Sequence, residues 1–202
     1  ARGPLVLLVN SALGLNSVQD VIAYGKAHPG KLSYGSFGVG SSAHIFGQIF
    51  SKNVGVPMEH VPYKGGAEIV ADLTEGRLPI AFDAAPQGIQ TAKTGKAKII
   101  GVAAAKRHPS LPNVPTISEQ AVKDIDLMGF VAWFGPAGMK PEVVAKLREA
   151  IAQALAQPNV QAFYRDAAYT AETSTPAELA SDVAKGHASW GRLVQAAGIE
   201  KQ

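Results

Sequence analysis

Short apolar runs alternate along the first half of the chain with segments whose apolar residues recur every three or four positions. A short apolar run bounded by glycine or proline indicates a buried strand, and the wider spacing indicates a helix with one apolar face. The predicted strands are Pro4–Val9, Lys31–Ser36, Pro57–Val61, Leu78–Phe82 and Ala97–Ala103. The helices between them are predicted to begin near Ser17, Ser41 or Ser42, Gly66 and Pro86. This alternation predicts an α/β fold with a mostly parallel sheet that helices cover on both faces.

The pattern changes in the second half of the chain. The segment Arg107–Pro115 contains three prolines and is typical of an extended connector. A strand is predicted at Leu127–Phe134, followed by helices beginning at Pro141, Pro158 and Thr175. One or two strands are too few for a sheet, so we predict three parts: residues 1–14 as a crossing strand of a partial domain one, 15–125 as a complete α/β domain two, and 126–202 as the remainder of domain one.

Composition excludes several classes of protein. The chain has 202 residues, of which 47% are hydrophobic and 17% are charged, so it has enough apolar residues to bury a core. It has no cysteine, which excludes a disulfide framework and cysteine-ligated metal. No apolar run approaches the ~20 residues of a membrane-spanning helix. The formal net charge of +3 is too small to predict nucleic-acid binding.

The strongest local signal for binding is the stretch Tyr34–His44, in which a strand runs into a glycine loop and then a helix. Free amides and the positive end of the dipole at a helix N-terminus attract anions. Gly38 and Gly40 let the backbone approach an anion closely. Hydroxyl donors are supplied by Ser36, Ser41 and Ser42. The alternative is a tight turn in which a serine only caps the helix.

The segment Gly38–Ala43 also fits the dinucleotide fingerprint G-x-G-x-x-G/A, and Glu59 is spaced as the acid that binds the ribose. A dinucleotide-binding enzyme domain is the alternative function. The position of Glu59 argues against it, because Glu59 falls within its predicted strand instead of at the carboxyl end.

Two other groups are predicted to face the same edge of the sheet. In His60–Gly66, Tyr63 can donate a hydrogen bond beside a second glycine-led helix, or it can simply pack on the rim. Asp83 ends a buried strand, where it can accept a hydrogen bond from a ligand ammonium or hydroxyl group, or cap the next helix. We predict neither catalytic residues nor a metal site, because a serine and His44 within one helical turn rarely align for proton transfer and the five histidines are scattered.

Several stretches resemble, in order and spacing, the TctC/Bug family of periplasmic substrate-binding proteins, which serve tripartite tricarboxylate transporters. They are Tyr34–His44, His60–Gly66, Asp72–Gly76, Phe82–Asp83, Lys106–Thr116 and Trp133–Gly138. The resemblance implies a periplasmic-binding-protein-like (type II) fold, here with one complete parallel or mixed α/β lobe and a partial second lobe. It also implies capture of a small organic carboxylate, delivery to membrane transporter subunits, no enzymatic activity and no cofactor.

Carried over by position, the resemblance implies ligand-binding roles for eight residues. They are Ser36, Gly38, Gly40, Ser41, Ser42, His44, Tyr63 and Asp83. Family chains begin with a longer N-terminal part that supplies the other half of the cleft, and nothing here matches it. We therefore expect apolar surface to be exposed on Leu127–Phe134 and nearby helices, and expect a homodimer to form through the incomplete domain one.

Overall fold

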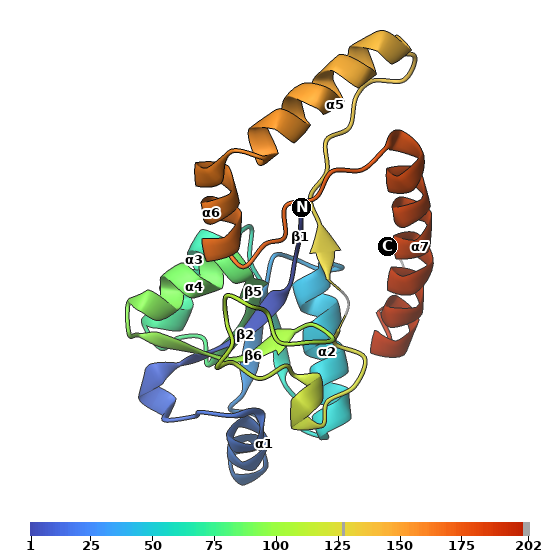
Figure 1. The fold of residues 1–202 in the computed structure, drawn as a ribbon. Helices are drawn as coiled ribbons and strands as arrows, with labels where there is room; N and C mark the ends of the chain where they lie inside the picture. The colour runs from blue at the N-terminus through green and yellow to red at the C-terminus, as the bar shows by residue number, and fades with distance from the viewer. Residues whose placement is uncertain (127, 200–202) are drawn as a thin grey trace.

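The first half of the chain forms a five-stranded sheet. The computed structural model describes residues 1–126 and 128–199. The strands lie in the order β4-β3-β5-β2-β6, which confirms the α/β class (Figure 1). Their bounds are β2 Leu5–Asn10, β3 Ser33–Ser36, β4 Glu59–Pro62, β5 Ile80–Ala84 and β6 Ala97–Ala103.

The sheet is mixed, as the expected parallel or mixed lobe allows: four strands run in one direction and β2 runs opposite to them. β3 runs parallel to β4 and β5, whereas β2 lies between β5 and β6 and runs antiparallel to both. An apolar run reveals burial and not direction, so the sequence pattern does not distinguish the two cases. The strand expected to precede the α/β unit is thus part of that unit's sheet. The domain boundaries themselves stay a prediction.

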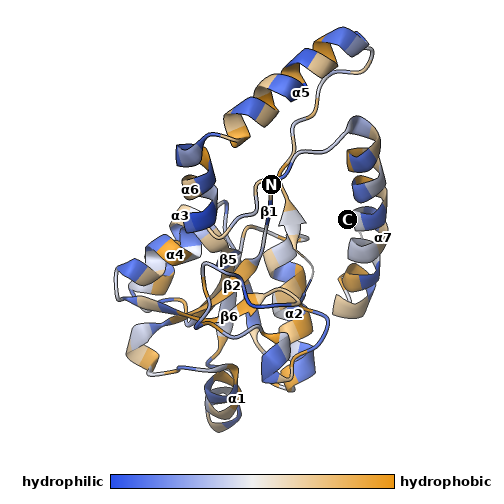
Figure 2. Cartoon of the chain, in the orientation of Figure 1, coloured by the Kyte–Doolittle hydropathy of each residue, from blue (hydrophilic) through white to orange (hydrophobic). Residues whose placement is uncertain are grey.

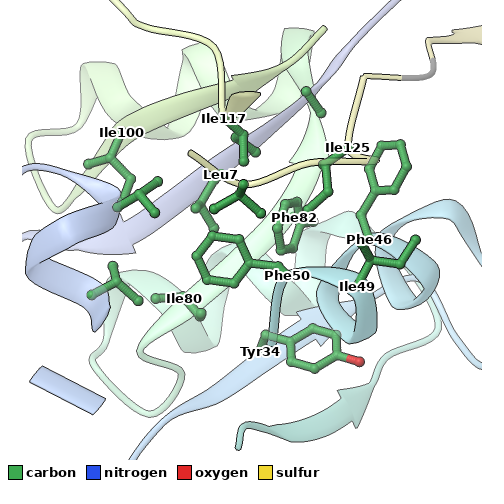
Figure 3. Close-up of a cluster of buried hydrophobic side chains, with 14 of the residues drawn as sticks. Leu7, Tyr34, Phe46, Ile49, Phe50, Ile80, Phe82, Ile100, Ile117 and Ile125 are labelled. Atoms are coloured by element: carbon green, nitrogen blue, oxygen red, sulfur yellow. The ribbon is translucent and has the colours of Figure 1, made fainter. Parts of the chain in front are cut away.

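Helices cover both faces of this sheet, as predicted. Leu7 and Val9 of β2 point to the face covered by α1 (Val18–Ala27) and α2 (Ser42–Val54), where Phe46 and Phe50 are buried (Figure 3). Side chains alternate along a strand, so Val6 and Leu8 point to the opposite face. That face is covered by α3 (Gly66–Thr74) and α4 (Ala85–Lys93).

The second half of the chain packs on this unit only in part. Its elements are the 3₁₀ turn η2 (Ser118–Gln120), β7 (Gly129–Phe130), α5 (Pro141–Leu155), α6 (Pro158–Asp166) and α7 (Pro176–Ala197). Two short elements belong to the first half: β1 (Arg2–Gly3), which pairs antiparallel with β7, and a further 3₁₀ turn, η1 (Ser11–Leu13). α7 lies against α2, with the Trp190 ring stacked 5.5 Å from that of Phe46. α5 projects away from the sheet (Figure 1).

The predicted strand Leu127–Phe134 is wrong in extent. Only Gly129 and Phe130 form a strand, and Leu127 lies outside the described residues. Exposure of apolar residues in this region is confirmed, since Trp133 is 82% and Phe134 72% exposed. The exposed large apolar side chains of the second half include Phe130, Val131, Trp133, Phe134, Leu147 and Phe163, and we call these six its exposed apolar surface. Figure 2 shows apolar residues along α5.

Candidate functional site

The predicted anion loop lies between the carboxyl end of β3 and the first turn of α2. Gly38 and Gly40 adopt φ angles of +112° and +77°, a region that side chains disfavour. Ser41 is the N-cap: its Oγ accepts a hydrogen bond from the His44 amide and donates one to the Gly38 carbonyl. The anion-binding loop and the simple capped turn therefore have the same geometry, because the capping serine also shapes the glycine turn.

Ser36 stabilises the loop through hydrogen bonds of its buried hydroxyl group. Its side chain is buried, with Oγ 2.6 Å from Nε2 of His60. The same oxygen accepts a hydrogen bond from the Gly38 amide and lies 3.0 Å from the Gly38 carbonyl. The Ser36 hydroxyl is therefore used to fix the loop.

His44 and His60 form a stacked pair behind the loop, with ring centroids 3.8 Å apart. The Gly40 amide donates to Nδ1 of His44. Burial lowers the pKa of both histidines, and His44 further lowers that of His60, to about 4. Both rings are neutral at neutral pH, so they shape the loop and add no positive charge to it. The sequence pattern does not single out His60, because its contact with Ser36 depends on the pairing of β4 with β3.

Ser42 is half-buried and lies where the loop meets the helix. It is the first residue of α2, and its amide has no hydrogen-bond partner among residues 1–126 and 128–199. It lines a cavity of about 190 Å³ that also touches Ala84 at the end of β5. The positive end of α2 is thus directed at this cavity.

Asp83 lies at the carboxyl end of β5 and is 1% exposed. Its Oδ1 accepts a hydrogen bond from the Ala84 amide, while its buried Oδ2 has no partner within the described part of the chain. Burial raises the pKa of this carboxyl group to about 6, an effect that the bond from Ala84 opposes. The alternative role as a helix cap is wrong, because Ala84 is the N-cap of α4 and no side chain caps that helix.

Tyr63 points away from the glycine loop. Its hydroxyl donates to Oδ2 of Asp72 on α3, at 2.8 Å, and its pKa is raised to about 12 by burial and by that carboxylate. The neighbouring Gly66, in contrast, lies against the Asp83 carboxyl group, since a Cβ at Gly66 would stand 3.7 Å from Oδ1. The structure therefore brings the loop residues together and places Asp83 near the N-terminus of a second helix, α3. The Tyr63 hydroxyl is not directed at the loop. Ligand contact by any of the eight residues stays a prediction.

The dinucleotide interpretation is not supported. Glu59 is the first residue of β4 and pairs with Ser33, the first residue of β3. It therefore lies at the amino end of these strands, whereas the Gly38 loop follows their carboxyl end. An acid there does not reach a ribose bound at that loop.

Among residues 1–126 and 128–199, no three acidic or histidine side chains are grouped so that they could hold a metal ion. In the same ranges, no helix has the length and apolarity needed to cross a membrane.

Comparison with known proteins gives consistent results. The sequence model described as "Tripartite tricarboxylate transporter family receptor" matches residues 1–199. A curated relative from Pseudomonas sp. (strain P51), the UPF0065 protein in the tcbD-tcbE intergenic region, is 30% identical over 95% of this chain. The chain spans 57% of that relative's length.

Two solved structures from Rhodopseudomonas palustris share the fold. One, described with adipate, has a TM-score of 0.93 and 31% identity, and covers 98% of this chain and 67% of its own. The other, MatC with bound malate, has a TM-score of 0.82 and 25% identity, and covers 96% of this chain and 67% of its own. The likeness thus includes nearly all of this chain and about two thirds of either neighbour.

Proposed function

Because this chain belongs to the TctC family of tripartite tricarboxylate transporter receptors, we propose that it captures a small organic carboxylate in the periplasm for a membrane transporter. The observation that carries the proposal is the family match over residues 1–199. Two structural neighbours are described with adipate and with bound malate, and both compounds are carboxylates. The proposal is one of binding and delivery, without catalysis.

The carboxylate is proposed to bind at the first turn of α2. Its oxygens would accept hydrogen bonds from the Ser42 amide and hydroxyl, beside a helix end that carries roughly +0.5 of an elementary charge. Ser36, Ser41 and the two histidines fix the loop and act through it. The free Oδ2 of Asp83 would accept a hydrogen bond from a ligand hydroxyl or ammonium group.

Capture is proposed to need two lobes. Residues 15–125, with β2 in their sheet, would supply one wall of the cleft, and residues 126–202 part of the other. Closure of the lobes would remove the ligand from water, and the closed form would dock on the transporter.

Replacing Gly40 by valine tests the loop. At a φ of +77° a β-branched residue is strained, so we expect the loop to shift and adipate to bind at least tenfold more weakly. The measurement is an NMR titration of the loop amides with adipate. Gly14→Val is the matched control: its φ is +69°, its Cβ also meets nothing within 4 Å, and it lies outside the loop. If adipate at tens of millimolar leaves the Gly38–Ser42 amides of the folded wild type unmoved, the proposed site is wrong.

We also propose that the exposed apolar surface of the second half pairs with a second copy of the chain. Side chains such as Trp133 and Phe134 are far more exposed than a stable monomer favours. We expect sedimentation equilibrium to give twice the 21.0 kDa chain mass, and the double variant Trp133→Ser/Phe134→Ser to weaken the dimer at least tenfold. A monodisperse monomer at high micromolar concentration would contradict this arrangement.

A further inference from the structure

The cavity beside Ser42 has aromatic walls contributed by segments far apart in the sequence. Phe37 comes from the glycine loop, Phe46 from α2, Phe130 from β7, and Tyr169 and Trp190 from the C-terminal third. Trp190 is fixed in place by its stacking on Phe46. These rings therefore form a wall that exists before any ligand arrives.

Most residues that line this cavity are apolar, and their polar side-chain groups are those of Ser42, Tyr169 and Trp190. The α2 end offers Ser42, whose amide is unpartnered within the described residues. The lining contains neither lysine nor arginine. Ala84 also lines the cavity, and the carboxylate of its neighbour Asp83 adds negative charge: burial raises the pKa of Tyr169, and this carboxylate raises it further. One anionic group is thus favoured at the α2 end, and the remaining wall favours hydrocarbon.

The volume agrees with such a ligand. An apolar cavity of about 150 Å³ holds benzene in a protein interior. The present cavity, at about 190 Å³, therefore accepts a phenyl group or a short alkyl chain next to the carboxylate.

We propose that the ligand of this site is a carboxylate with an apolar body, alkyl or aryl, and not a polyhydroxylated acid. This inference rests on the proposed carboxylate capture and specifies which carboxylates the site selects. The carboxylate lies at Ser42, and the hydrocarbon lies between Phe130 and Trp190.

The test uses hexanoate and gluconate, which have the same number of carbons and one carboxylate each. The chain contains two tryptophans, so a Trp133→Phe background leaves Trp190 as the sole tryptophan reporter. We expect hexanoate to shift the Trp190 emission and to bind at least tenfold more tightly than gluconate. Equal or tighter binding of gluconate would overturn the inference while leaving carboxylate capture intact. Failure of both acids, together with adipate, to bind the folded chain would instead overturn the proposed function.

A wall substitution gives the second measurement. Phe130→Ser should lower the affinity for hexanoate about tenfold and leave that for gluconate unchanged. Val183→Ser is the control, because Val183 is 40% exposed, does not line the cavity and lies outside the apolar surface proposed to pair with a second copy. If both variants change hexanoate binding equally, the cavity is not where the apolar body lies.

Discussion

Replacing Phe46 by alanine is expected to lower the free energy of unfolding by about 3–5 kcal/mol. The side chain is fully buried, and its ring packs edge-on against Phe82 of the sheet and stacks on Trp190 of α7. Removing it leaves a cavity between the sheet and α2 and also removes the contact that helps hold α7.

Urea denaturation followed by circular dichroism measures this loss. Val39→Ala is the control, because Val39 is 52% exposed and lies outside the apolar surface proposed to pair with a second copy. We expect the control to change the unfolding free energy by less than about 0.5 kcal/mol. A Phe46→Ala variant as stable as that control would mean that α7 and the sheet do not share a core.

Replacing Asp83 by asparagine is expected to stabilise the protein at neutral pH by about 1–3 kcal/mol. Folding raises the pKa of this carboxyl group from 3.8 to about 6. Between those values the folded state holds a proton that the unfolded state releases, so the unfolding free energy falls as the pH rises through this window. Each unit of pKa shift corresponds to about 1.36 kcal/mol. Asparagine has no charge to bury, so the variant avoids this loss.

Chemical denaturation at a series of pH values checks the sign. The advantage of Asp83→Asn should vanish below pH 3.8 and be complete above about 6. Asp72→Asn is the control of opposite sign. Hydrogen bonds from Tyr63 and Arg77 lower the pKa of Asp72, so its carboxylate stabilises the fold as the pH rises. An Asp83→Asn variant less stable than wild type at neutral pH would show that the acid has a partner in solution.

The elements could be predicted where the signal is local. Ser17, Ser41 and Thr175 each accept a hydrogen bond from an amide of the helix that they begin, as their positions in the sequence indicate. The direction of β2 could not be predicted, because its apolar residues are buried in either orientation. The strand at 127–134 was overestimated for a related reason: apolar residues there resemble a buried strand, yet Trp133 and Phe134 have little to pack against.

The candidate site, too, could be predicted from the sequence only where its signal is local. The glycine loop follows from residue types at fixed spacing, and the structure has the loop that these residues predict. The direction of the Tyr63 hydroxyl depends on Asp72, which sequence spacing does not place opposite it. The stacking of His60 on His44 depends on the register of β4 beside β3, which only the folded sheet defines.

The position of β2 has a consequence for the order of folding. Its partners are β5 and β6, and the pairing of Leu5 with Ala103 spans nearly the whole α/β unit. Chains are synthesised at about 5–20 residues per second, so β2 leaves the ribosome several seconds before β6. Until β5 emerges, the apolar residues of β2 have no strand to pair with, and β6 follows later still. Because such distant contacts form slowly, we expect the sheet to close late, with insertion of β2 as the step that limits the folding rate.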